Sequence, residues 1–215
     1  MTRSVVHFTT DYIIWKKCCR VNTFDKNLNF ITSALRSVSG EAFDTLLEDC
    51  LRTIDSRGKL VVSGLGKNVS ICEKFVGTLN SLGIPAAFMH TNTAAHGDLG
   101  LVAKGDLVIL LTKSGETQES VHLSELLQKR ECKIWLLSFS SDSTLHRQLS
   151  NHLIIRLEHE GDEWNIVPNN STVINLIILQ ELAIRIAREK GVTLEDFRKN
   201  HPGGAIGTMP EGSPK

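Results

Sequence analysis

Five short, predominantly apolar runs alternate along this chain with longer segments whose apolar residues recur at helical spacing. The runs occupy residues 59–63, 86–90, 107–112, 133–138 and 152–157. Because apolar and polar residues do not alternate within them, they are typical of strands buried on both faces, and the helical segments between them supply the crossovers that parallel strands need. The pattern predicts an α/β protein: a three-layer αβα sandwich, doubly wound around a five-stranded parallel sheet.

The longest helical segment, residues 171–190, is apolar nearly all round. A helix of this kind is buried on several sides, so we expect it also to contact another subunit. The predicted helices are two within residues 27–57, one at 69–82, one that ends at Arg130, the long one at 171–190 and a short one at 194–200.

Charge and cysteine content narrow the class of protein. Lys+Arg and Asp+Glu balance at 24 each, so nothing indicates a nucleic-acid or membrane partner. The five cysteines are odd in number and form no CxxC pair, which is typical of a reducing compartment. Polar residues interrupt the apolar stretch 173–187, and no signal peptide precedes residue 22. We therefore expect a cytoplasmic protein.

Two glycine-containing turns follow predicted strands and lead into predicted helices. The first is SGLGKN at residues 63–68, where small residues let backbone N–H groups approach an anion and Lys67 adds a positive charge. Alone, this turn is equally well explained as a tight strand–helix connection. The second is TKSGET at residues 112–117, whose hydroxyls suit a phosphate but also suit a helix N-cap. Two such turns on neighbouring strands favour a phosphate site.

Three further segments carry groups able to transfer protons. His96 lies among small residues in AAHGDL, Glu160 follows the fifth predicted strand, and His201 begins the segment HPGG. Taken singly, each is more simply explained as a structural or surface residue. The spacing of the histidines and acids matches no standard zinc pattern, so we expect no metal.

Together, these segments resemble the sugar isomerase (SIS) domain, and within it the arabinose-5-phosphate isomerases. The resemblance covers residues 43–207. Its most telling pieces are GLGKN (64–68), AAHGDLGLV (94–102), TKSGETQE (112–119), PNNST (168–172) and DFRKNHPGGAIG (196–207). The AAHGDLG and HPGGAIG segments are specific to this isomerase group, whereas the SGET turn is shared with sugar-phosphate sensors. We expect a SIS domain at residues 23–207, between an N-terminal arm (1–22) and a tail (208–215).

The resemblance implies a functional role for each candidate residue. The implied catalytic residues are Lys67, His96, Glu119, Glu160 and His201. The implied phosphate-binding residues are Ser63, Gly66, Lys67, Thr112, Ser114 and Thr117. It also implies no cofactor and a small sugar phosphate as the ligand. It further implies a homotetramer with active sites shared between subunits, in which His201 serves a neighbouring pocket.

Three departures from the family pattern stand out. The turn usually reads S(N/Q)SGE, but here it reads TKSGE, with Lys113 at its second position. Residues 161–167 (GDEWNIV) replace a more apolar stretch. Many members continue into a pair of CBS modules, whereas this sequence ends at Lys215.

The implied reaction interconverts ribulose 5-phosphate and arabinose 5-phosphate through a cis-enediol, supplying Kdo biosynthesis. We expect Glu160 to act as the carbon base, with Glu119 as the alternative, and His201 and His96 to assist ring opening and proton transfer at oxygen. Lys67 would stabilise the enediolate or the phosphate. The alternatives are a non-catalytic sugar-phosphate regulator and a SIS isomerase of another sugar phosphate.

Overall fold

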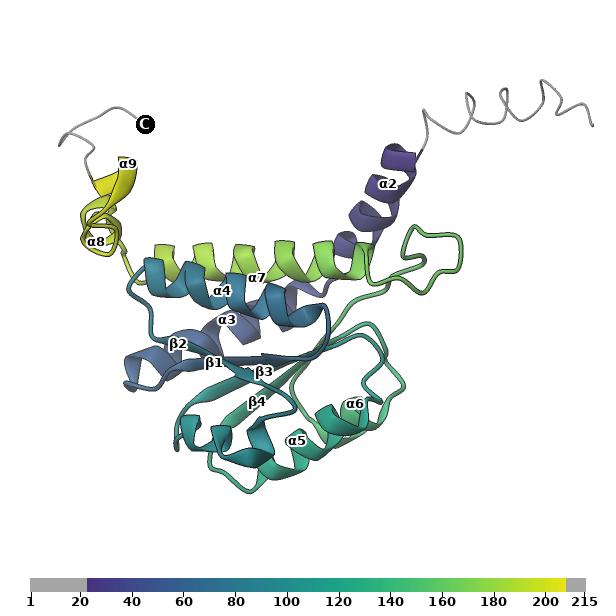
Figure 1. Ribbon diagram of the computed structural model, residues 1–215, viewed down its shortest axis with the longest axis horizontal. Helices are drawn as coiled ribbons and strands as arrows, with labels where there is room; N and C mark the ends of the chain where they lie inside the picture. Colours follow the sequence, from purple (N-terminus) through teal and green to yellow (C-terminus); the bar gives the residue numbers. More distant parts are fainter. Residues whose placement is uncertain (1–22, 208–215) are drawn as a thin grey trace, which may run out of the picture.

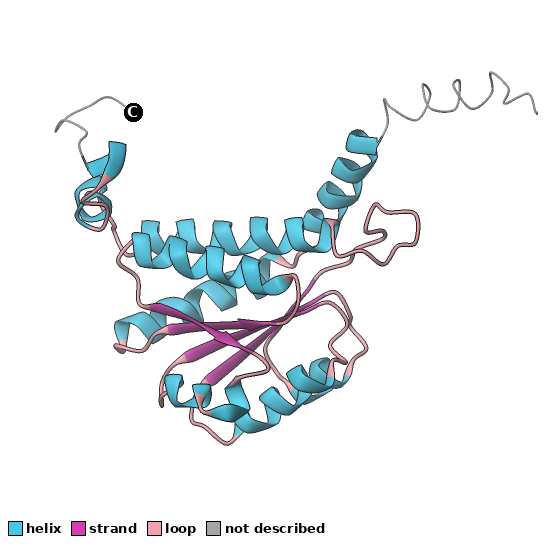
Figure 2. Ribbon diagram, in the orientation of Figure 1, coloured by secondary structure: helices cyan, strands magenta, loops and turns pink. Residues whose placement is uncertain are grey.

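A single parallel sheet forms the centre of the molecule. The computed structural model describes residues 23–207, and in it five strands pair in the order β2-β1-β3-β4-β5. Figures 1 and 2 show this twisted sheet between two layers of helices, which confirms the predicted three-layer αβα sandwich. The strands are β1 (Leu60–Gly64), β2 (Ala86–His90), β3 (Leu107–Thr112), β4 (Lys133–Ser138) and β5 (His152–Ile154).

Both faces of the sheet are apolar because alternate strand residues enter two separate cores. Leu60, Val62 and Ile109 pack into the core on one face, whereas Val61 and Val108 pack into the core on the other. The first face is covered by α3 (Gly40–Asp55), α4 (Asn68–Ser81) and α7 (Asn170–Glu189). The second is covered by α5 (Gln118–Gln128), α6 (Thr144–Gln148) and the 3-10 turns η1 (Ala94–His96) and η2 (Asp98–Leu101). This two-sided burial is why the strand sequences lack polar alternation.

The fifth strand is shorter than the predicted run 152–157. Ile155 still donates its backbone N–H to the Ser138 carbonyl at 2.9 Å, but the N–H of Arg156 donates to the Ser37 hydroxyl. Because β5 lies at the edge of the sheet, the chain leaves the strand there and continues into the loop before α7. The prediction also missed α6, whose five residues are too few for a clear helical period.

Helix α7 spans the sheet and presents two different faces. Ile174, Ile178, Leu182 and Ile186 are buried in the core. The opposite face exposes Val173, Ile177 and Ile184, so in a single chain the helix is not covered all round. By length and composition alone α7 is apolar enough to cross a membrane, which the sequence did not lead us to expect, but 56% of its apolar window is buried inside the fold. It is packed as a core helix.

The two ends of α7 are set far apart. Figure 1 shows α2 (Thr23–Arg36) leaning away from the body near the first turn of α7, and α8 (Leu194–Lys199) with α9 (Gly204–Gly207) beyond its last turn. A helix of this length measures ~30 Å. The predicted arm and tail, residues 1–22 and 208–215, lie outside the described residues.

Candidate active site

A cavity of about 240 Å³ opens where the strand order reverses between β1 and β3. In open parallel sheets this switch point, at the carboxyl ends of the strands, is where ligands bind. Its walls come from the β1–α4 turn, the β3–α5 turn, Phe139 after β4, and the first residues of α7. The two turns that the sequence singled out therefore do face one cavity.

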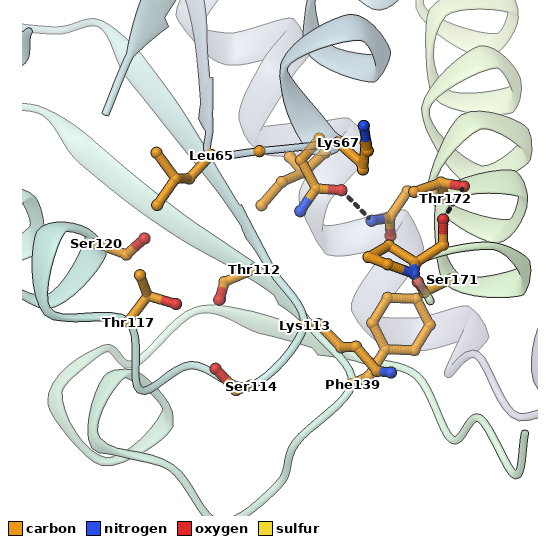
Figure 3. A pocket seen from close by; sticks show the side chains of 15 residues that line it. Leu65, Lys67, Thr112, Lys113, Ser114, Thr117, Ser120, Phe139, Ser171 and Thr172 are labelled. Carbon is orange, nitrogen blue, oxygen red and sulfur yellow. Dashed lines mark hydrogen bonds between the residues drawn. The ribbon is translucent and has the colours of Figure 1, made fainter. Parts of the chain in front are cut away.

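The β3–α5 turn is held in shape by its own side chains. The N–H of Gly115 donates to the Thr112 hydroxyl at 3.1 Å, and the N–H of Glu116 donates to the Ser114 hydroxyl at 3.2 Å. The Glu116 carboxylate accepts from both the backbone N–H and the hydroxyl of Thr144, each at 2.8 Å, and so ties the turn to α6. Figure 3 shows the hydroxyls of Thr112, Ser114 and Thr117 in one part of the cavity. Hydroxyl and amide donors gathered in this way suit the acceptor oxygens of a phosphate.

We expect Gly115→Ala to damage this turn. Gly115 has a φ of +69°, and an added Cβ would lie 2.3 Å from the Ser143 hydroxyl oxygen. The strain is worth roughly 1–3 kcal/mol and the turn must move away from α6 to relieve it. Thermal unfolding should show a lower Tm, and calorimetry should show weaker sugar-phosphate binding. Gly77→Ala is the matched control, because a Cβ there meets nothing within 4 Å and the α4 backbone favours alanine; equal Tm and affinity in the two variants would contradict the expectation.

The β1–α4 turn contributes only part of what the sequence suggested. Gly66, with a φ of +60°, and Lys67 both line the cavity. Ser63 does not line it: the residue is 1% exposed, and its hydroxyl lies 3.0 Å from that of Thr91, just beyond β2. Figure 3 shows Lys67 on the side of the cavity away from the hydroxyls of the β3–α5 turn.

Glu160 lies directly behind the cavity wall. Its carboxylate is fully buried; Oε1 is 2.6 Å from the Lys113 ammonium, and Oε2 accepts from the N–H groups of Asn169 and Ser171 at 3.0 and 2.9 Å. Burial alone would raise the pKa of Glu160, but the Lys113 ammonium and the α7 amides outweigh it and hold that pKa below its usual range. Glu160 is therefore ionised, although a carboxylate base near neutral pH would benefit from a raised pKa.

Three other predicted catalytic residues, His96, Glu119 and His201, do not line this cavity in a single chain. His96 and Glu119 line a second cavity of about 330 Å³, between the segment after β2 and the first turns of α5. His201 follows α8, with its ring against Phe197 and its Nδ1 2.7 Å from the Phe197 carbonyl oxygen. Since α8 follows the last turn of α7 and Glu160 contacts the first, His201 and Glu160 are separated by the length of that helix.

Two residues of the cavity were missed as functional candidates. Lys113 appeared only as a departure from a pattern, because its contact with Glu160 joins residues 47 positions apart. Asn175 is 1% exposed and donates from Nδ2 to the Asn68 side chain at 3.1 Å, while its Oδ1 has no partner in the described part of the chain. An unpaired buried acceptor in a cavity wall suits a ligand hydroxyl. Within residues 23–207, no three His, Cys, Asp or Glu side chains are grouped to hold a metal ion.

The fold and the cavity define a doubly wound α/β protein with a crevice of hydroxyls and amides at its switch point. The sequence model of the SIS domain matches residues 53–185, more than half of the chain. The protein therefore belongs to the SIS domain family.

Named relatives and solved structures agree with this family. The chain is 34% identical over 192 residues to the arabinose 5-phosphate isomerase KdsD of Pseudomonas aeruginosa, covering 85% of this chain and 59% of that protein. It thus spans about half the length of the curated relatives it matches. The structure of Escherichia coli CFT073 c3406 in complex with arabinose 5-phosphate has a TM-score of 0.78 at 30% identity, covering 90% of this chain and 99% of the other.

The same fold also occurs in a regulator. The sugar isomerase domain of an RpiR transcription factor from Sphaerobacter thermophilus has a TM-score of 0.69 at 20% identity, covering 85% of this chain and 98% of the other. At that identity the likeness concerns the fold alone. The architecture by itself therefore does not separate an enzyme from a sugar-phosphate sensor.

Proposed function

We propose that this chain is an aldose–ketose isomerase that interconverts ribulose 5-phosphate and arabinose 5-phosphate. The observation that carries the proposal is the β3–α5 turn, which presents hydroxyls to the same cavity wall behind which the ionised Glu160 lies. A phosphate on this turn would hold the sugar so that a carboxylate lies near its reactive end. The KdsD relatives and the arabinose 5-phosphate complex of the similar structure support this choice of substrate.

The reaction moves one proton between neighbouring carbons. A carboxylate removes the proton from C2 of the open-chain aldose, giving a cis-enediol, and returns it to C1 while a proton passes from O2 to O1. We assign the carbon base to Glu160, with Glu119 as the alternative, and the oxygen and ring-opening steps to His201 and His96. Lys67 would stabilise negative charge on the phosphate or the enediolate. No cofactor or metal takes part in this scheme.

We further propose a homotetramer that shares its active sites, because one chain does not complete the site. Glu160 contacts the first turn of α7, whereas His201 follows α8 beyond the last turn, so a site containing both takes them from different copies. The exposed face of α7 (Val173, Ile177 and Ile184) offers an apolar surface for such contacts. We place the enzyme in the cytoplasm, where it would supply arabinose 5-phosphate to Kdo and lipopolysaccharide synthesis.

A turnover assay tests the proposal. The purified chain, offered a panel of pentose, hexose and heptose phosphates, is expected to equilibrate arabinose 5-phosphate with ribulose 5-phosphate and to convert the others far more slowly. Calorimetry on the same preparation measures binding separately. Binding of arabinose 5-phosphate without turnover would instead identify a sugar-phosphate regulator, and faster turnover of a hexose or heptose phosphate would identify another SIS isomerase.

A further inference from the structure

Lys113 is the charged partner that joins the β3–α5 turn to Glu160. It lies between Thr112 and Ser114, both of which line the cavity, and it lines that cavity itself. Its side chain is 43% exposed, while the carboxylate it contacts is 0% exposed. Figure 3 shows the Lys113 side chain extending from the turn toward Phe139. One residue therefore lies within reach of both a bound phosphate and the buried acid.

The Glu160 carboxylate is closed off from the cavity in this arrangement, because it is 0% exposed and the Lys113 ammonium lies 2.6 Å from Oε1. Oε1 forms an ion pair with the Lys113 ammonium but has no hydrogen bond within the described residues, whereas Oε2 accepts from the amides of Asn169 and Ser171. The cavity wall at this point consists of Lys113 and Ser171, with Glu160 behind them. A carbon-bound proton on a sugar in the cavity would meet the ammonium before it met the base.

We propose that Lys113 exchanges partners when a sugar phosphate binds, leaving the Glu160 carboxylate for the phosphate and thereby opening Oε1 to the sugar. The inference rests on the proposed isomerase function. A lysine is suited to such an exchange, because its ammonium is a compact charge with three donors on a flexible stem. A phosphate dianion offers more charge and more acceptor oxygens than the carboxylate that it replaces.

Among the described charged groups near Glu160, Lys113 is the one that directly contacts the carboxylate. The Asp162 carboxylate accepts from amides of its own loop, the His159 ring accepts from Gly161 and stacks on Phe30, and Lys26 lies over that Phe30 ring. Among the described residues, Lys113 is the one charged side chain that forms an ion pair with the Glu160 carboxylate. Other charged or titratable side chains on the surrounding elements include Lys67 in the β1–α4 turn and Lys26 on α2. The loop before α7 adds Glu158, His159, Asp162 and Glu163.

The exchange has a defined pH signature. With Lys113 in place, the pKa of Glu160 is lowered, so the free protein keeps the carboxylate ionised to a pH below the usual glutamate range. When Lys113 moves to the phosphate, that pKa rises again and the carboxylate becomes a stronger base. The acid limb of kcat/KM, which reports the free protein, is then expected at lower pH than the acid limb of kcat, which reports the complex.

The first test does not depend on turnover. The Glu160 carboxyl is titrated by carbon NMR in the wild-type protein and in Lys113→Gln, each with and without inorganic phosphate, with Glu160→Gln used to assign the signal. Phosphate is expected to raise the pKa of Glu160 more in the wild type than in Lys113→Gln, because only the wild type has a cation to lose. An equal or smaller rise in the wild type would overturn the exchange.

Kinetics with arabinose 5-phosphate provide the second test. Lys113→Gln is expected to raise KM by about tenfold, the loss of one charge-assisted hydrogen bond, and to bring the two acid limbs together. Lys113→Arg, which keeps the charge, should restore the separation between the acid limbs of kcat and kcat/KM. Lys104→Gln, at an exposed lysine, should leave KM and both acid limbs unchanged. Unchanged limbs in Lys113→Gln would refute the role. A wild type without turnover would refute the isomerase, while the NMR titration would still decide the exchange.

Discussion

Replacing Glu160 with glutamine is expected to reduce turnover of arabinose 5-phosphate by a factor of ~10²–10⁴, the usual effect of removing a positioned base. Glutamine keeps the shape of the side chain but cannot accept the proton from carbon. Substrate should still bind, because the cavity-lining hydroxyls and amides are unchanged and Lys113 is left free for the phosphate. The measurement is kcat from a coupled assay together with the dissociation constant from calorimetry.

The control for this variant is Glu163→Gln. Glu163 is an exposed acid in the same loop, so its replacement makes the same change in charge without touching the buried carboxylate. Circular dichroism melts identify any loss of turnover that comes from unfolding. A Glu160→Gln protein that is folded and as active as the wild type would contradict the assignment of Glu160 and transfer the carbon base to Glu119.

Mixing two inactive variants is expected to restore activity. Glu160 and His201 contact elements at opposite ends of α7, ~30 Å apart, so a shared site takes one of these residues from each of two copies. When Glu160→Gln and His201→Ala subunits assemble at random in equal amounts, about a quarter of the sites contain both intact residues. Co-expression with two different tags, followed by an assay of the doubly purified oligomer, measures the recovery.

The control mixture pairs Glu160→Gln with the double variant Glu160→Gln/His201→Ala. Every site in that mixture lacks the base, so no activity should return whatever the arrangement of subunits. Native mass spectrometry confirms that mixed oligomers form in both preparations. Mixed oligomers of the first pair with no more activity than the control would show that His201 and Glu160 do not complete one site from neighbouring chains.

The sequence predicted the fold closely because its strands are buried on both faces. The runs at residues 86–90, 107–112 and 133–138 coincide with β2, β3 and β4, since most residues of each run enter one core or the other. The edge strand β5 was predicted too long, because Arg156 donates its backbone N–H to the Ser37 hydroxyl just after α2 rather than to a neighbouring strand. The local sequence pattern identifies a strand, but it does not show where the pairing with the neighbouring strand stops.

The shape of the β3–α5 turn was predictable for a related reason. Thr112, Ser114, Gly115 and Thr117 lie within six consecutive residues. The hydroxyls of Thr112 and Ser114 accept from the N–H groups of Gly115 and Glu116, so the motif carries part of its own geometry. Ser63 shows the limit of such reasoning. Its place beside a glycine turn suggested a phosphate contact, but the strand pleat directs its hydroxyl toward Thr91, just beyond the neighbouring strand.

Sequence alone determined the parallel αβα architecture, the SIS family and the set of polar residue types at the strand ends. Tertiary structure decided which of those residues share a cavity, because their mutual distances depend on strand order and on where α7 begins and ends. It brought Lys113 against Glu160, placed His96 and Glu119 along a second cavity, and carried His201 to the far end of α7. A charge pair between segments 47 residues apart leaves no local pattern, so only the packed chain could reveal it.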